Sequence, residues 1–70
     1  MEIILTAHIR YRIEKRKILL EEVNEAISFP DKVIKKHEKY YYQKKFKRGT
    51  IEVPCIRTER HIKVLTAYWL

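Results

Sequence analysis

The chain has 70 residues, a formal net charge of +7 and a single cysteine, Cys55. A chain of this length closes one core, which buries roughly 60% of the surface that the unfolded chain exposes. One cysteine forms neither an intrachain disulfide nor a thiolate zinc site, and no apolar run approaches the roughly 20 residues that span a bilayer. We therefore expect a single cytoplasmic domain over residues 1–70, with no cofactor and no membrane association.

The charge is distributed unevenly along the chain. Residues 8–17 and 35–48 are strongly basic, whereas residues 18–31 hold four acidic residues and no Lys or Arg. We therefore expect the folded molecule to have a positive and a negative side, and the positive side suits a negatively charged partner. The simpler alternative is that the lysines only keep a small protein soluble.

The composition and the length of the chain each carry a further hint. Lys, Arg, Glu and Ile are abundant, and Asn24 and Gln43 are the only side-chain amides, a bias reported for proteins of heat-loving organisms. A core below about 80 residues seldom supplies more than about 3–5 kcal/mol of stability. A homodimer contact, a partner subunit or surface ion pairs can add to it.

Two helices are expected in the first part of the chain. Thr6 can cap a helix over residues 7–16, in which Ile9 and Ile13 stand one turn apart and face the core. A second helix over residues 19–28 has apolar side chains at helical spacing and glutamates near its N-terminus. Pro30 ends this helix, because the residue before a proline avoids the helical conformation.

From Asp31 onward the pattern alternates and is rich in aromatic and β-branched residues, which is typical of strands. We predict strands over residues 32–36, 40–47, 50–57 and 61–69. Gly49 can adopt the positive φ of a tight turn, and Pro54, which donates no ladder hydrogen bond, indicates a bulge or an edge position. The sequence thus predicts an α+β fold with two N-terminal helices packed on a four-stranded antiparallel β-sheet.

His8, Arg12 and Arg16 are spaced by four residues and form one stripe on the first helix, beside its apolar face. Arginines can hold a phosphate with two N–H groups, and an imidazole can transfer a proton near neutral pH. The stripe is therefore well placed to line a cleft between helix and sheet. Alternatively, His8 packs near the helix start and the arginines pair with glutamates.

The segment YYYQKKFKR, residues 40–48, combines aromatic rings with cations on one strand and its turn. Stacking faces and phosphate-binding lysines are what single-stranded RNA binding needs. Alternatively, Tyr40, Tyr42 and Phe46 are the core face of a half-buried strand. The residues predicted to bind nucleic acid are Lys35, Lys36, Tyr41, Lys44, Lys47 and Arg48.

Other sites are not indicated. His37 and His61 lie in predicted turns without ligand spacing, so no metal site is expected. Glycine-rich phosphate loops and serine–histidine–aspartate arrangements are missing from the sequence. For the aromatic end formed by residues 66–70, a core or interface role is expected.

Three segments carry a resemblance to a known family: HIRYRIEKR, ILLEEVNEAISFPDKV and the closing IKVLTAY. Over nearly its entire length the chain resembles a small prokaryotic family, the domain of unknown function 4258. The family's histidine and two arginines fall on His8, Arg12 and Arg16. Its other matched positions are Val23, Pro30, Val64, Thr66 and Tyr68. The chain departs from the family at residues 17–19, where members often have Gly-Ile-Ser, and at Pro54, where valine is usual.

That family is similar in layout to the RelE and BrnT toxins, which place N-terminal helices against a four-stranded antiparallel sheet and cleave RNA without a metal. The resemblance implies a RelE-like domain over residues 1–70. It also implies an acidic antitoxin that neutralises the toxin by binding its basic cleft. We therefore expect a metal-independent endoribonuclease of a toxin–antitoxin system, with RNA and an acidic antitoxin as partners.

Such cleavage needs a base for the 2′-hydroxyl, a cation for the phosphorane charge and an acid for the leaving oxygen. The residues expected to carry it are His8 for proton transfer, Arg12 and Arg16 as phosphate clamps, and Lys45, Tyr42 and Tyr68 in support. This hypothesis requires the helix stripe and the cations of residues 40–47 to face one concave space. The alternative is a non-catalytic basic module that binds nucleic acid or an acidic protein.

Overall fold

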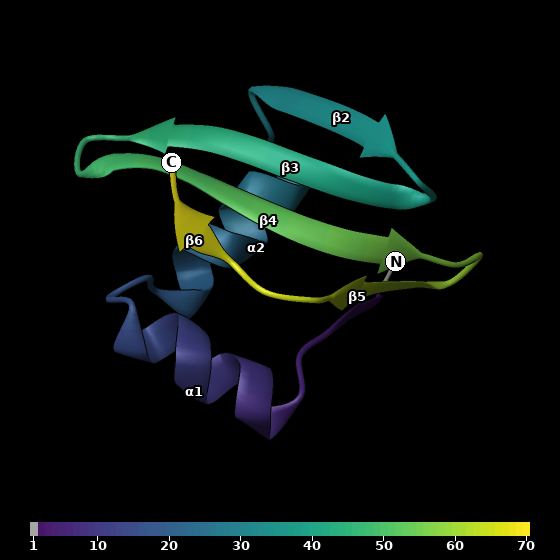
Figure 1. Ribbon diagram of the computed structural model, residues 1–70, viewed down its shortest axis with the longest axis horizontal. Coiled ribbons are helices and arrows are strands. Elements are labelled where there is room, and N and C mark those ends of the chain that lie inside the picture. The colour runs from purple at the N-terminus through teal and green to yellow at the C-terminus, as the bar shows by residue number, and fades with distance from the viewer. Residues whose placement is uncertain (1) are drawn as a thin grey trace.

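The computed structural model describes residues 2–70. The elements in chain order are β1 (Glu2–Ile4), α1 (Ala7–Lys15), α2 (Leu20–Ser28), β2 (Lys32–Lys36), β3 (Lys39–Phe46), β4 (Gly49–Arg57), β5 (His61–Val64) and β6 (Tyr68–Trp69). The strands form one sheet in the order β1-β5-β4-β3-β2, with β6 paired to β4 beside β5 (Figure 1).

The predicted four-stranded antiparallel sheet was wrong, although the α+β class agrees with the structure. The sheet has six strands and is mixed, because β1 pairs in parallel with β5, placing Ile3 beside Ile62. Residues 61–69, predicted as one strand, form the two strands β5 and β6, which pair antiparallel with different parts of β4.

Pro54 lies where the pairing along this side of β4 is interrupted. Its neighbour Cys55 pairs with Val64 of β5, whereas Glu52 pairs with Tyr68 of β6. Proline has no N–H to donate to a partner strand. The Pro54 carbonyl still accepts a hydrogen bond, from the N–H of Leu65 at 2.9 Å. The other side of β4 pairs continuously with β3. The interruption therefore explains why the last predicted strand is divided.

Local signals in the sequence explain both helices. The Thr6 hydroxyl accepts a hydrogen bond from the Ile9 N–H at 3.3 Å, so the predicted cap of α1 is confirmed. In α2, Leu19 has no capping side chain, and the Glu22 carboxylate instead accepts the Leu19 N–H at 2.9 Å. Phe29 follows the last residue of α2 and precedes Pro30, as expected.

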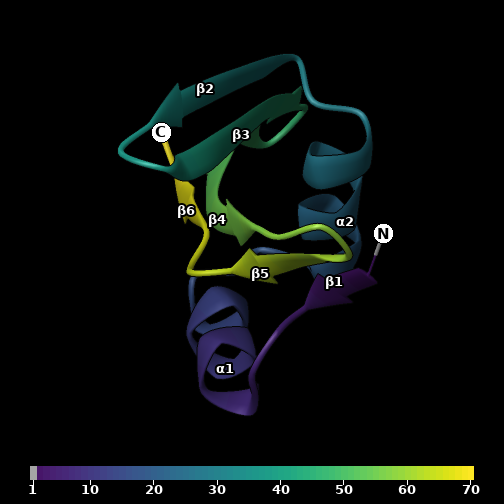
Figure 2. The ribbon, with the colours of Figure 1, turned by 90° about the vertical axis from the view of Figure 1, so that its right-hand side faces the viewer.

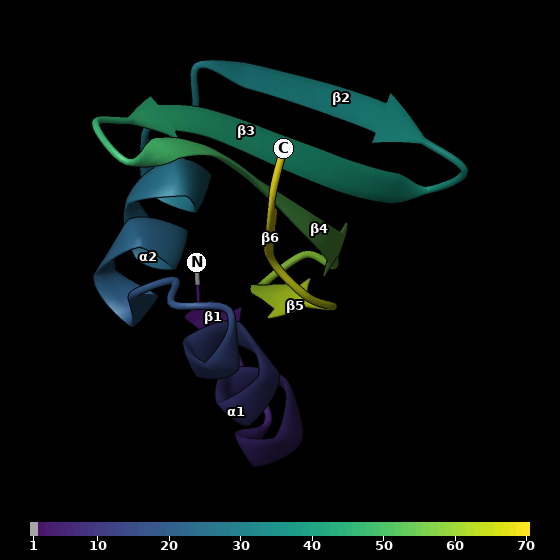
Figure 3. The ribbon, with the colours of Figure 1, turned by 60° about the vertical axis from the view of Figure 1, so that its left-hand side comes forward.

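The core lies between α2 and the sheet, which curls around that helix (Figure 2). Side chains on this inner side include Val23 of α2, Tyr42 of β3 and Val53 of β4, all buried. α1 lies beyond the β5 and β1 edge (Figures 2 and 3), where it adds Ile13 to the core. The opposite side of the sheet, which we call the uncovered face, carries Tyr41, Gln43, Glu52 and Tyr68.

Candidate nucleic-acid interface

The outward side of α1 carries the predicted stripe. His8, Arg12 and Arg16 are all exposed, whereas Ile13 on the other side of the helix is fully buried and Ile9 packs against the core. The helical spacing alone produces this separation, because positions four apart share a face. The stripe is therefore open to solvent, as a binding surface must be.

A shallow hollow of about 400 Å³ lies on this side of the helix, and we call it the α1 basic face. Its lining residues are His8, Tyr11, Arg12, Lys15 and Arg16. The Lys15 ammonium lies 5.7 Å from the centroid of the Tyr11 ring, within the range of a cation–π contact. The lining contains three cations and no carboxylate, so it attracts phosphate and repels metal ions.

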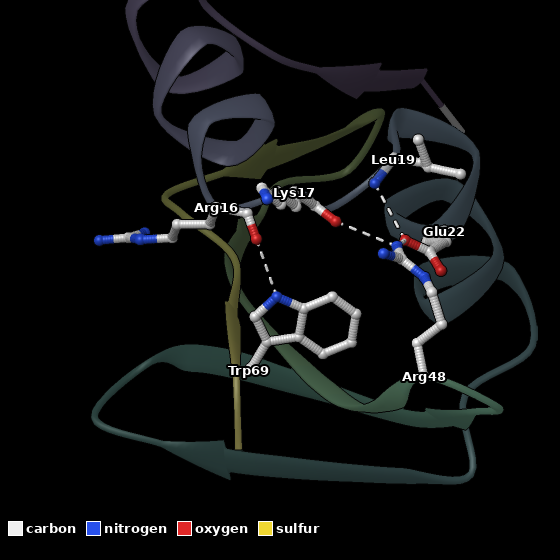
Figure 4. A network of polar contacts seen from close by, with 6 residues as sticks. All are labelled: Arg16, Lys17, Leu19, Glu22, Arg48 and Trp69. Atoms are coloured by element: carbon white, nitrogen blue, oxygen red, sulfur yellow. Dashed lines mark hydrogen bonds and ion pairs between the residues drawn. The ribbon is translucent and has the colours of Figure 1, made fainter.

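Arg16 fixes the end of α1 to the last part of the chain. Its guanidinium donates to the Thr66 hydroxyl at 2.8 Å and to the Ala67 carbonyl at 3.0 Å. The Arg16 carbonyl accepts the indole N–H of Trp69 at 2.9 Å (Figure 4). Part of the Arg16 guanidinium is thus used to position the helix, which limits its capacity as the predicted phosphate clamp.

Tyr68 lies on the uncovered face and not in the hollow. Its hydroxyl donates to one oxygen of the Glu52 carboxylate, while the Gln43 amide donates to the other oxygen at 2.8 Å. The hydrogen bond to Glu52, together with partial burial, raises the pKa of Tyr68 to about 12. Tyr68 therefore stays a protonated hydrogen-bond donor at neutral pH.

Tyr42 and Lys45, the predicted supports from the sheet, do not line the α1 basic face either. Tyr42 is 4% exposed and stacks on Tyr40 with ring centroids 6.3 Å apart, and its burial raises its pKa. Lys45 is exposed, and its backbone N–H donates to the Asp31 carboxylate at 2.7 Å. The structure therefore does not assemble the expected shared concave space from α1 and β3.

The predicted nucleic-acid-binding residues fall into two groups. Arg48 and Lys44 form ion pairs within the molecule, with Glu22 at 2.5 Å and Asp31 at 3.9 Å, although the Arg48 side chain stays half exposed. The second group, also exposed or half-exposed, consists of Lys35, Lys36, Tyr41 and Lys47. Of these, Lys36 and Tyr41 line a second hollow on the uncovered face, together with Ile34 and Glu52.

Tyr11 and Lys15 belong to the α1 basic face but were not among the predicted site residues. The signal was present in the sequence, since they stand three and seven residues after His8 and therefore share its side of the helix. The contact between Arg16 and Thr66, which are 50 residues apart, has no such local signal.

Within residues 2–70, no group of three or more His, Cys, Asp or Glu side chains comes together as potential metal ligands. None of the helices formed by these residues is long and apolar enough to cross a membrane.

The fold and the site define a small α+β domain with a basic helix face. Residues 5–69 match the family described as a domain of unknown function (DUF4258), and the chain belongs to this family. The chain has no match among the curated proteins or the solved structures that were compared.

Proposed function

We propose that the protein is a toxin-like endoribonuclease that binds RNA on the α1 basic face and cleaves it without a metal. One observation carries the proposal: His8 shares a solvent-open hollow with Arg12, Lys15 and Arg16. An imidazole among phosphate-binding cations combines proton transfer with charge stabilisation, which is the combination that RNA cleavage through the 2′-hydroxyl needs.

In the proposed reaction, the 2′-oxygen attacks the adjacent phosphorus and the bond to the 5′-oxygen breaks. His8 accepts the proton of the 2′-hydroxyl, and the hydroxyl of Tyr11, a residue that also lines the hollow, donates a proton to the leaving oxygen. Arg12 and Lys15 hold the charge that develops on the phosphorane, and Arg16 positions the helix through Thr66. The products are a 2′,3′-cyclic phosphate and a 5′-hydroxyl.

The resemblance to RelE and BrnT toxins supports the same function by analogy, because a shared layout alone does not establish an activity. It points to action on RNA in the cytoplasm and to an acidic antitoxin as partner. The +7 net charge fits both partners, since RNA and an acidic protein are each attracted to a basic surface.

A non-catalytic RNA-binding module is the second candidate. The observation that favours it is that Tyr42 and Lys45 lie away from the hollow, so that among the described residues His8 has no support there from the sheet. A hollow lined by α1 alone is sufficient for binding and gives less catalytic help than a site on which helix and sheet converge.

Incubation of labelled single-stranded RNA with the protein in EDTA separates the two candidates. The nuclease gives fragments with cyclic phosphate ends, and the His8→Ala variant cleaves about 100-fold or more slowly while still binding RNA. His37→Ala, which removes an exposed histidine from the β2–β3 turn, serves as the matched control and should cleave normally. A salt-sensitive shift without fragments would contradict the nuclease and favour the binding module.

A further inference from the structure

β2 forms one edge of the sheet. It pairs with β3 on one side, and it ends the strand order on the other. An edge strand presents backbone N–H and C=O groups that a strand from another chain can pair with. Four of its five residues are exposed, and the fifth, Ile34, is half-buried. Among the described residues, no strand pairs with the outer edge of β2.

The side chains of β2 combine positive charge with an exposed apolar side chain, that of Val33. Lys32 and Lys36 lie on the uncovered face on either side of Ile34, and Lys35 lies on the inner side over the Tyr40 ring, 5.5 Å from its centroid. Val33, on the inner side, is 45% exposed although its pairing partner Tyr42 is buried. A strand added here would cover Val33 and meet the lysines.

We propose that β2 is the docking edge for an extended acidic segment of a partner protein, which adds to the sheet as a further strand. In this mode of recognition, backbone hydrogen bonds give affinity and alternate side chains give specificity. Acidic side chains of the added strand pair with Lys32 and Lys36, and an apolar side chain on its other face covers Val33. Opposite charges placed across neighbouring strands stabilise such pairing.

Charge disfavours a second copy of this chain as the occupant. If two β2 strands pair antiparallel around Ile34, each Lys32 faces the Lys36 of the other copy. Like charges directly opposite one another are destabilising. RNA would satisfy the lysines but would leave the backbone groups of β2 unpaired and Val33 uncovered.

β2 and α1 lie at opposite ends of the molecule in all three ribbon views (Figure 1). A segment bound at β2 therefore leaves the α1 basic face open, so that partner and RNA can bind together. The proposal does not depend on nuclease activity, because it rests on the sheet edge alone.

A synthetic peptide of alternating glutamate and valine, about eight residues long, tests the proposal as a fluorescent probe. The matched control is a peptide of the same charge in which proline replaces valine, because proline removes the N–H groups that a ladder needs. The first peptide should bind and slow hydrogen exchange at the β2 amides, and the second should do neither. Equal binding of both peptides, or no binding of either, would overturn the proposal.

Charge reversal locates the contact. Lys32→Glu combined with Lys36→Glu should weaken binding of the glutamate–valine peptide about tenfold or more. The control, Lys47→Glu combined with Lys63→Glu, makes the same charge change at exposed positions outside β2 and should have the smaller effect. Equal loss in both double variants would show a general charge effect and would contradict docking at β2. In a mixture with labelled RNA, displacement of the RNA by the peptide would contradict separate sites.

Discussion

The guanidinium of Arg48 lies 2.5 Å from the carboxylate of Glu22, and this ion pair joins the turn between β3 and β4 to α2. Arg48 also donates to the Lys17 carbonyl at 3.0 Å and lies over the Trp69 ring, 5.0 Å from its centroid (Figure 4). The same Glu22 carboxylate accepts the Leu19 N–H at the start of α2. One carboxylate therefore holds a helix start and a sheet turn together.

Glu22→Ala should lower the free energy of unfolding by about 0.5–3 kcal/mol. The substitution removes the cap of α2, worth about 0.5–2 kcal/mol, and an ion pair whose arginine is half exposed, worth up to about 1 kcal/mol. Urea unfolding measures the change, and Glu21→Ala at an exposed neighbouring position provides the control. Equal midpoints for the two variants would contradict the role given to Glu22.

Lys17→Gly should stabilise the protein by about 0.5–1 kcal/mol. Lys17 follows α1 with a φ of 60°, a left-handed conformation that costs a residue with a side chain about 1 kcal/mol and that glycine adopts freely. Its carbonyl, which accepts from Arg48, is retained in the variant. Glu14→Gly inside α1 is the contrasting change and should destabilise by about 1 kcal/mol. A lower urea midpoint for Lys17→Gly would contradict the prediction.

The Tyr68 hydroxyl should make stability depend on alkaline pH. Its pKa is raised from 10.0 to about 12, so the folded state favours the protonated phenol. The resulting stability is fully present below pH 10 and is lost as the pH rises through about 12. The difference in urea midpoint between the protein and Tyr68→Phe should therefore shrink between pH 9 and 12. A constant difference over that range would show that the bond to Glu52 does not govern this titration.

Much of the architecture could be predicted because its signals are local. Thr6, the helical spacing of Ile9 and Ile13, and Pro30 placed both helices close to their observed bounds. The alternation in residues 40–47 correctly separated buried Tyr42 from Tyr41 on the uncovered face. These features depend only on neighbours within a turn or a strand.

The parts that were missed depend on contacts between distant residues. β1 has three residues and exists through its parallel pairing with β5, about 60 residues away, which local periodicity does not reveal. The division between β5 and β6 follows from Pro54 on the neighbouring strand. Pro54 was identified as unusual, but the strand that it would interrupt could not be chosen without the sheet order.

For the site, the spacing of His8, Arg12 and Arg16 predicted a shared helix face, and the structure places them in one hollow. Periodicity gives the side of an element on which a residue lies, but not the element that this side meets. The sequence therefore could not show that α1 lies beyond the β5 and β1 edge, where Lys45 and Tyr42 do not join the hollow.

The central claim is that RNA binds on the α1 basic face, and the salt dependence of RNA affinity in two double variants tests it most directly. Arg12→Ala with Lys15→Ala should weaken binding of single-stranded RNA more than tenfold and reduce the slope of log affinity against log salt by about 1.4, or about 0.7 for each lost phosphate contact. Lys45→Ala with Lys47→Ala should bind nearly as well as the unmodified protein. If the second pair loses affinity and slope while the first keeps both, RNA binds on the sheet and the claim is contradicted.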